Sequence, residues 1–387
     1  MATGLNRVAE IYADRAARVT ELKAGGKRII GYLDIFPVVE MLTALDLVPY
    51  RLLGDLNEPI TRADTCLTTA VCPFLRSVMD LGLKGKYDFL DGVVFAHGCE
   101  VSEKMAHIWR TYLHPPYAHF IDTPHTTHQA ARKQHRALLK DFQKTLEELT
   151  GQELTAEKLR EAVRIHNRQR VLVRELYDLR KPDPPLISGA ETVRVMVAVT
   201  SLPVTEGNEL LEQVIGEIKG RTDGPAPKPA RLIVWGSIID NTALVDLVES
   251  LGANVVMDDT TVGSRDYFPL VEITDDPRDG LADRYLVALR SPRTFRETVP
   301  DGNRRKDYMA DLESRFGYLK EYAREWQVNG VILQVLRYCD IHGYEVPALK
   351  DYLESIGLPG IYLEHDYSKV ALAQLRTRVQ AFLEIIG

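Results

Sequence analysis

Two kinds of hydrophobic pattern alternate along the chain. Short runs of β-branched and other apolar residues are typical of buried strands, whereas apolar residues three and four positions apart are typical of one face of a helix. In two separate regions the first pattern alternates with the second, which predicts parallel sheets covered by helices on both faces. The predicted strands are residues 27–33, 47–53, 92–96 and 117–122 in the first region, and 231–235, 254–257, 330–336 and 360–364 in the second.

Outside these regions the pattern is helical. Residues 5–24 place apolar side chains along one side of a single predicted helix. Residues 126–177 are long, charged and periodic, which predicts a helical connector. Residues 188–200 are β-branched enough for a strand, but Ser188 and Glu191 have the spacing of a capping box. We therefore predict a helix there.

The two strand-rich regions also resemble each other in sequence. Asp91-Gly-Val-Val-Phe-Ala-His-Gly-Cys-Glu100 and Asn329-Gly-Val-Ile-Leu-Gln-Val-Leu-Arg-Tyr-Cys-Asp340 both pass from a glycine through a strand to a cysteine and an acid. We predict an α/β fold of two similar Rossmann-like or flavodoxin-like lobes, produced by duplication, with a cleft between them. The predicted parts are an N-terminal helix (1–26), a first lobe (27–125), a helical connector (126–229) and a second lobe (230–387), in which residues 260–305 are irregular.

Composition and charge narrow the class of protein. The 387 residues are 45% hydrophobic and 27% charged, as in ordinary globular proteins. A net charge of −7 has the wrong sign for a protein that tracks nucleic-acid phosphates. The first residues are amphipathic and charged, unlike a signal peptide, and no apolar run reaches the roughly 20 residues that a bilayer span needs. We expect a cytoplasmic protein that binds neither nucleic acid nor membrane.

Three of the four cysteines stand at positions that suit metal ligands. Cys99 and Cys339 end equivalent strands, and Cys72 begins a predicted helix, whereas Cys66 precedes it on a polar stretch and is predicted to be a spare thiol. A single cysteine in an apolar segment is more often a small buried residue. Three soft thiolates, however, suit an iron–sulfur cluster or zinc. Zinc remains open because His97 and His342 stand near Cys99 and Cys339.

Several polar residues near the predicted strand ends are acid–base candidates. Glu40 begins the helix after the first strand and is expected to face the cleft, although an acid at a helix N-terminus is also simply stabilising. Glu100 and Asp340 follow two of the cysteines, where they could transfer protons or cap helices. His97 and His365, at strand ends, could move protons near neutral pH, although a lone histidine is more often structural.

Other conspicuous residues fit structural roles. Asp258 and Asp259 with Arg265 predict an ion-paired loop. The three tryptophans lie on periodic segments and are expected in hydrophobic cores. They are Trp109, Trp235 and Trp326.

Five motifs in order resemble one known superfamily over essentially the whole chain. They are Cys72-Pro-Phe-Leu-Arg-Ser77, Asp91-Gly-Val-Val-Phe-Ala-His-Gly-Cys99, Gly236-Ser-Ile-Ile-Asp-Asn241, Met257-Asp-Asp-Thr-Thr-Val-Gly-Ser-Arg265 and Tyr338-Cys-Asp-Ile-His-Gly-Tyr-Glu345. Together they are similar to the 2-hydroxyacyl-CoA dehydratase and benzoyl-CoA reductase superfamily. The resemblance implies an enzyme subunit whose Cys72, Cys99 and Cys339 bind one [4Fe–4S] cluster between two lobes. It also makes contact with coenzyme A the alternative to an ion-paired loop at Asp258, Asp259 and Arg265.

The resemblance also implies partners. These are a homologous sister subunit and an ATP-hydrolysing activator, with its own [4Fe–4S] cluster and a ferredoxin upstream, which delivers an electron for an acyl-CoA substrate. The chain has neither a Gly-x-x-x-x-Gly-Lys-Ser/Thr loop nor a Gly-x-Gly-x-x-Gly motif. Nucleotide chemistry is therefore expected on a partner.

The motifs identify the superfamily more sharply than they identify the reaction that the enzyme catalyses. The motifs are most similar to the smaller cluster-bearing subunit of ATP-dependent benzoyl-CoA reductase, which reduces an aromatic acyl-CoA ring. The alternative is a 2-hydroxyacyl-CoA dehydratase, which expels a hydroxyl group through a ketyl radical. A non-catalytic protein that carries or assembles a cluster, and a metal-free ligand-binding protein, are alternatives from other classes.

Overall fold

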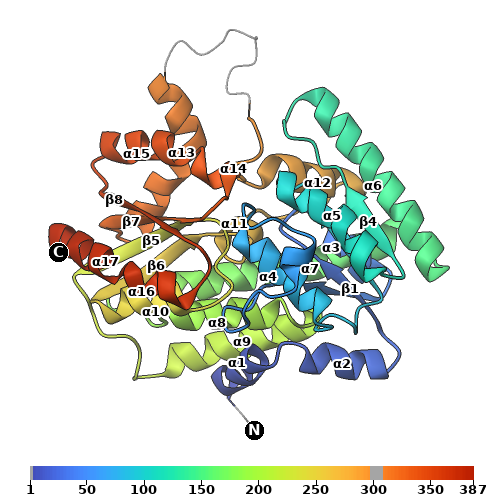
Figure 1. The fold of residues 1–387 in the computed structure, drawn as a ribbon, viewed down its shortest axis with the longest axis horizontal. Helices are drawn as coiled ribbons and strands as arrows, with labels where there is room; N and C mark the ends of the chain where they lie inside the picture. Colours follow the sequence, from blue (N-terminus) through green and yellow to red (C-terminus); the bar gives the residue numbers. More distant parts are fainter. Residues whose placement is uncertain (1–2, 297–307) are drawn as a thin grey trace.

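The computed structural model describes residues 3–296 and 308–387. Within them the strands form two separate four-stranded parallel sheets. In Figure 1 the second sheet lies to the left, β1 and β4 lie to the right, and helices α4, α11 and α14 lie between them. The predicted architecture of two α/β lobes with parallel sheets is confirmed.

The two sheets have the same strand order. The first is ordered β2-β1-β3-β4 and the second β6-β5-β7-β8. In each sheet the first strand along the chain is central, the second lies at one edge, and the third and fourth follow on the other side of the first. This shared topology supports the predicted duplication. The strands are β1 (Arg28–Tyr32), β2 (Leu47–Arg51), β3 (Gly92–Ala96), β4 (Ala118–Ile121), β5 (Ala230–Gly236), β6 (Ala253–Asp259), β7 (Gly330–Leu336) and β8 (Gly360–His365).

Helices connect the strands and cover the sheets. Parallel strands need such crossovers, because each strand must return to the same end of the sheet before the next begins. The connecting and covering helices are α3 (Val39–Ala44), α4 (Pro73–Leu83), α5 (Glu100–Leu113), α10 (Ala243–Ser250), α13 (Tyr308–Glu325), α14 (Asp340–Gly343), α15 (Val346–Ser355), α16 (Lys369–Gln374) and α17 (Arg376–Ile386), with one 3₁₀ turn at Ala63–Thr65.

The connector is helical, as predicted. It consists of α6 (Gln129–Thr150), α7 (Ala156–Asp178), α8 (Gly189–Val199) and α9 (Val204–Gly220). Helix α8 is the segment whose β-branched composition also allowed a strand. Its capping box is formed: Ser188 Oγ accepts from the Glu191 N–H at 3.0 Å, and Glu191 Oε2 accepts from the Ser188 N–H at 2.9 Å. These bonds satisfy backbone donors at the helix start and explain why the helix forms.

The N-terminal segment differs from its prediction as one helix. It forms α1 (Gly4–Ala13) and α2 (Ala17–Ala24), because Asp14 Oδ1 accepts the backbone N–H groups of Ala16 and Ala17 and starts a new helix. Both helices pack on the connector: the Leu5 N–H donates to Glu217 at 3.0 Å, and Arg18 pairs with Glu206 at 2.8 Å. Helices α1 and α2 thus lie at the lower edge of the molecule in Figure 1, packed against the connector.

The segment predicted to be irregular is partly helical. It contains α11 (Ser264–Tyr267), α12 (Pro277–Asp283) and a π-helical turn at Arg284–Ala288. Arg284 and Arg51 both pair with Asp266, at 3.1 and 2.9 Å. Such long-range pairs hold the segment, and local periodicity could not reveal them. The rest of this prediction, residues 297–305, lies outside the described residues.

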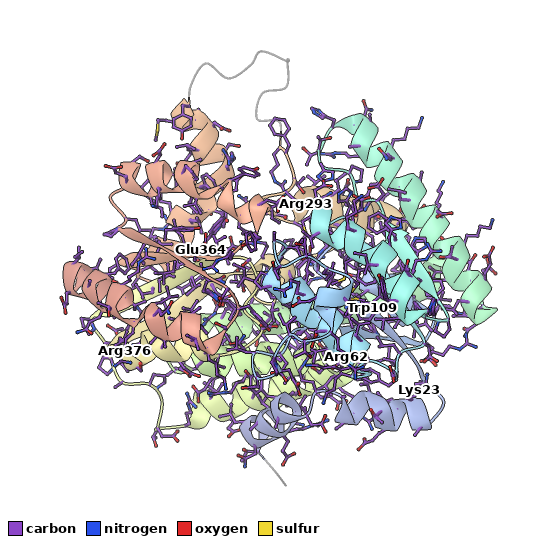
Figure 2. The ribbon with its side chains drawn as sticks, viewed as in Figure 1. Lys23, Arg62, Trp109, Arg293, Glu364 and Arg376 are labelled. Atoms are coloured by element: carbon purple, nitrogen blue, oxygen red, sulfur yellow. The ribbon has the colours of Figure 1, made fainter. Side chains whose placement is uncertain are left out.

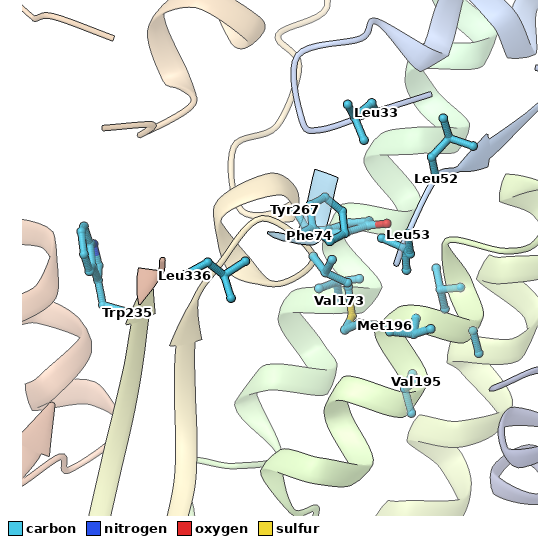
Figure 3. Close-up of a cluster of buried hydrophobic side chains, with 14 of the residues drawn as sticks. Leu33, Leu52, Leu53, Phe74, Val173, Val195, Met196, Trp235, Tyr267 and Leu336 are labelled. Atoms are coloured by element: carbon cyan, nitrogen blue, oxygen red, sulfur yellow. The ribbon is translucent and has the colours of Figure 1, made fainter. Parts of the chain in front are cut away.

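One hydrophobic core crosses from lobe to lobe. In Figure 3, Trp235 and Leu336 of the second sheet lie on one side, Leu33 and Leu52 beside the first sheet lie on the other, and further apolar side chains fill the space between them. The tryptophans predicted to be in cores are buried, as expected. No helix among the described residues has the length and apolarity needed to cross a membrane.

Gly236 marks the closest backbone approach in the second sheet and supports a stability prediction. A Cβ atom at this position would lie 1.8 Å from the carbonyl oxygen of Gln334 on β7. We expect Gly236→Ala to destabilise the fold by about 2 kcal/mol or more in urea unfolding, because buried backbone cannot move aside freely. The control is Gly216→Ala in α9, where a Cβ meets nothing within 4 Å. That variant should gain up to about 1 kcal/mol, and equal effects would contradict the prediction.

Candidate functional site

The three predicted cysteine ligands all precede the first turn of a helix. Cys72 is the N-cap of α4, Cys99 the N-cap of α5, and Cys339 the residue before α14. The Ser102 N–H donates to Cys99 Sγ at 3.3 Å. Burial raises the pKa values of Cys72 and Cys339, and backbone N–H groups at the starts of the other helices partly oppose that rise. Backbone donors at helix starts favour negative sulfur.

These three thiols come from both lobes and lie near enough for the charge of one to raise the pKa of another. Burial raises the pKa of Cys72 to about 11 and that of Cys99 to about 12, and negative charge on Cys72 adds to the rise at Cys99. The pKa of Cys339 is raised well above its usual value by burial and by the charges of both other cysteines. Cys66 differs from these three: its thiol donates to the Ala63 carbonyl at 3.4 Å, and its pKa is raised by burial and by Asp80 against the lowering effect of Thr65, with no cysteine among the causes.

The positions of Cys99 and Cys339 follow from sheet topology. In the first sheet the chain passes from β1 to β2 on one side and from β3 to β4 on the other side. The direction of the crossover thus reverses between β1 and β3, and it reverses in the same way between β5 and β7 of the second sheet. Open α/β sheets bind ligands at this switch point, beyond the carboxyl ends of the strands. Cys99 follows β3 and Cys339 follows β7. The duplicated strands therefore supply one thiol from each switch point.

A carboxylate missed by sequence reasoning lies beside Cys72 and Cys99. Asp34 follows β1, has a φ of +70°, and its negative charge raises the pKa of both thiols. A Cβ atom at Gly98 would lie 1.9 Å from Asp34 Oδ2, so glycine is required for this approach. Burial raises the pKa of Asp34 itself. The glycine before Cys99 was the available signal, but its partner could not be read from the sequence.

The ion pair predicted after β6 is present in the second lobe. Arg265 Nε lies 3.1 Å from Asp259 Oδ1, with both side chains buried. Asp258 instead accepts from Tyr177 at 2.8 Å and from Arg180 at 3.3 Å. The expected ion pair is thus formed by Asp259 and Arg265, but it joins the end of β6 to α11 and not two positions of a loop. Arg265 also contacts His342 in the helix that follows Cys339.

His97 and Glu100 belong to a polar group that also includes Asp122 and His125. His97 Nδ1 bonds to Asp122 at 2.8 Å, and His97 Nε2 lies 3.6 Å from Glu100. His125 Nε2 lies 3.2 and 3.4 Å from the two nitrogens of His97, with the rings at 88°. His97, Glu100 and His125 each place one possible ligand atom within 4.8 Å of the others, so their spacing alone would allow a metal ion.

The charge around this group also bears on the zinc alternative. The Glu100 side chain is 67% exposed. The pKa of His125 is lowered mainly by burial and further by the positive charge of Arg293, which is labelled near the centre of Figure 2. A nearby guanidinium opposes a bound cation. The arrangement suits proton exchange better than metal binding, and the catalytic roles of His97 and Glu100 stay predictions.

Glu40 lies in a buried ion pair. Its side chain is fully buried, with Oε1 2.5 Å from Arg170 Nη2 and Oε2 accepting from Tyr285 at 2.8 Å. Burial alone would raise the pKa of Glu40, but Arg170, His166 and Arg284 bring it down to about 2. Glu40 thus joins α3 to α7 and to the π-helical turn. Its predicted catalytic role stays a prediction, and its partners were not identified from the sequence.

Comparison with known proteins gives the family. The model described as 2-hydroxyglutaryl-CoA dehydratase, D-component, matches residues 35–386, which include the three cysteines. The chain is 25% identical over 366 residues to the (R)-phenyllactyl-CoA dehydratase beta subunit of Clostridium sporogenes, covering 93% of this chain and 92% of that protein.

Two further relatives also match from end to end. A benzoyl-CoA reductase subunit of Thauera aromatica is 24% identical, with 96% of this chain and 94% of that protein covered. The beta subunit of (R)-2-hydroxyglutaryl-CoA dehydratase from Acidaminococcus fermentans is 23% identical, with 97% of each covered. The chain belongs to the 2-hydroxyglutaryl-CoA dehydratase D-component family, within the 2-hydroxyacyl-CoA dehydratase and benzoyl-CoA reductase superfamily that its motifs indicated.

Proposed function

We propose that this protein is the iron–sulfur subunit of a heteromeric CoA-thioester enzyme, with Cys72, Cys99 and Cys339 holding one [4Fe–4S] cluster. The observation that carries the proposal is the placement of Cys99 and Cys339 at the switch points of two similar sheets, with Cys72 at a helix start near enough for its charge to raise the pKa of both. Three ligands leave one iron open to another group.

The surroundings of the thiols fit such a cluster. Their raised pKa values mean that they stay protonated unless a cation compensates for the buried charge, and iron supplies that charge. The backbone donors at three helix starts favour a negatively charged sulfur cluster. When bound, the cluster supplies one-electron chemistry at low potential. The apolar core between the lobes excludes water from one side of it.

A neighbouring cavity supports an acyl-CoA ligand. It has a volume of about 870 Å³ and includes Trp235 and Tyr318 in its wall. Arginine matches phosphate groups well, because its planar donors can bind two oxygens at once. Arg293 lines this cavity, and burial lowers its pKa to about 10 against the opposing charges of Asp34 and Cys99. The charged residues in the wall are Arg132, Arg290, Arg293, Arg296, Arg315, Asp311 and Glu345.

The partners are part of the proposal. The relatives are named as subunits, which supports a homologous sister subunit for this chain. An ATP-hydrolysing activator with its own [4Fe–4S] cluster would deliver the electron, with a ferredoxin upstream. The four free cysteines fit a reducing compartment, so we place the complex in the cytoplasm.

Two reactions are candidates. The residues of the five sequence motifs favour a benzoyl-CoA reductase, which would add electrons and protons to an aromatic ring. The family match and the phenyllactyl-CoA dehydratase relative favour a 2-hydroxyacyl-CoA dehydratase. Both reactions need a thioester carbonyl near a low-potential electron donor, so the cysteines suit either.

The proposal predicts a brown protein with a counted cluster. Full-length protein purified without oxygen should contain about four iron and four sulfide per chain. Iron and sulfide assays with an electron paramagnetic resonance spectrum of the reduced protein check this. A colourless protein, or one that binds zinc in place of iron under the same conditions, would contradict it.

A substrate-consumption assay distinguishes the reductase reaction from the dehydratase reaction. The complete complex, with sister subunit, activator and ATP, should consume either benzoyl-CoA or a 2-hydroxyacyl-CoA such as phenyllactyl-CoA. The substrate that disappears identifies the reaction. A correctly loaded complex that consumes neither would favour the cluster-carrier alternative.

A further inference from the structure

His342 is the third residue of α14, and its ring lies beside the Cys339 sulfur. It is buried, and its ring packs edge-on against Trp235, with the ring centres 5.3 Å apart. His342 Nδ1 lies 3.3 Å from Cys339 Sγ, and His342 Nε2 lies 2.8 Å from Nη1 of Arg265. The imidazole therefore bridges a guanidinium and a thiol.

Arg265 determines which ring nitrogen carries the proton. A guanidinium can only donate hydrogen bonds, so His342 Nε2 must accept, and the proton of the neutral ring must lie on Nδ1. The Gly236 carbonyl also faces the ring, but it accepts from the same Arg265 nitrogen at 2.8 Å. A proton on Nε2 would meet that Arg265 N–H directly. Nδ1–H is thus aimed at the Cys339 sulfur.

Arg265 itself cannot turn away easily. Its Nε lies 3.1 Å from Asp259 Oδ1, and its Nη2 donates to the Asp259 carbonyl at 2.7 Å. The other carboxylate oxygen of Asp259 accepts from Tyr318 at 2.5 Å. Every member of this chain of contacts is fixed by another, so the hydrogen bond to Cys339 is built into the fold.

The other two predicted ligands have different surroundings. Cys99 Sγ accepts from a backbone N–H, and the donors that lower the pKa of Cys72 are the backbone N–H groups of Leu75 and Phe74. Of the three sulfurs, within residues 3–296 and 308–387, only that of Cys339 lies within hydrogen-bonding distance of a side-chain nitrogen.

We propose that His342 is a positioning residue whose Nδ1–H, oriented by Arg265, donates to Cys339 and raises the reduction potential of the cluster held there. The proposal rests on the proposed function. A hydrogen bond to a ligating sulfur stabilises negative charge, and the reduced cluster carries more negative charge than the oxidised one. Loss of the donor should therefore make the cluster harder to reduce.

The tautomer can be tested without any cluster. In metal-free full-length protein labelled with ¹⁵N-histidine, the signals of His342 are assigned by their loss in His342→Phe. They should show a protonated Nδ1 and an unprotonated Nε2 at neutral pH. A protonated Nε2 would overturn the inference, whatever the protein binds.

The effect on potential is tested in cluster-loaded protein by a redox titration followed by electron paramagnetic resonance. His342→Phe should shift the midpoint to a more negative value while iron content stays unchanged. His342→Asn should restore most of the wild-type value, because its amide N–H can take the place of Nδ1–H. The matched control is His135→Phe, which removes another buried ring, one bonded to the Ala282 carbonyl at 3.2 Å.

The outcomes separate the inference from the proposed function. An unchanged midpoint in iron-replete His342→Phe, or an equal shift in His135→Phe, would overturn the tuning role while leaving the cluster in place. Wild-type protein without iron would overturn the proposed function and the tuning role together. The ¹⁵N spectrum would then still decide the hydrogen bond.

Discussion

Replacing Cys72, Cys99 or Cys339 by serine, one at a time, is expected to remove most or all of the roughly four iron atoms from each chain. A serine hydroxyl is a hard ligand that stays protonated at neutral pH, so it does not replace a thiolate on iron. Two remaining thiolates cannot hold the cluster between the lobes. The measurement is anaerobic iron and sulfide content, with the visible spectrum as a second readout.

The choice of serine also tests whether iron is lost simply because the variant fails to fold. Serine is a preferred N-cap residue, so helices α4 and α5 keep their starts when Cys72 or Cys99 is replaced. Circular dichroism should therefore remain that of the wild type. Cys66→Ser is the control and should keep its iron, because Cys66 bonds to the Ala63 carbonyl and no cysteine is among the causes of its raised pKa. Full iron content in all three variants would remove the cluster proposal.

Replacing Glu40 by glutamine is expected to lower the free energy of unfolding by about 3 to 5 kcal/mol. The change leaves the buried Arg170 guanidinium without its counter-charge, and an uncompensated buried charge is costly. The lowering of the Glu40 pKa from 4.5 to about 2 corresponds to roughly 3 kcal/mol on its own. Urea unfolding at neutral pH is the measurement.

This effect should depend on pH in a defined direction. Because the folded pKa of Glu40 lies below its unfolded value, its contribution is complete above about pH 4.5 and is lost as the pH falls towards 2. The difference between wild type and Glu40→Gln should shrink over that window. Glu161→Gln, which removes an exposed partner of Arg164, is the control and should change stability by less than about 0.5 kcal/mol. Equal losses in both variants would contradict the argument.

The parts of the fold that the sequence predicted depend on local patterns. Buried strands such as β3 and β7 are continuous apolar runs, and the capping box at Ser188 decided between helix and strand for α8. The placement of Cys99 and Cys339 at strand ends followed from the same runs. Parallel topology then puts such ends at one rim of a sheet.

The parts that were missed depend on contacts between distant segments. Glu40 was expected to face the cleft, but its partner Arg170 is 130 residues away in the sequence. His342 was considered as a zinc ligand, whereas Arg265, from a segment 77 residues earlier, points its ring at Cys339. Asp34 was not considered because its approach to the cysteines depends on Gly98 and on a positive φ. Local periodicity carries no information on such pairs.

The docking of α1 on the connector has a consequence for the order of folding during synthesis. The Leu5 N–H bonds to Glu217, 212 residues later. At ordinary ribosome speeds of about 5 to 20 residues per second, this partner emerges roughly 10 to 40 s after α1 does. Helix α1 must therefore stay undocked while the first sheet assembles, whereas α2 can pack on β1 and pair with Asp91 as soon as that sheet forms.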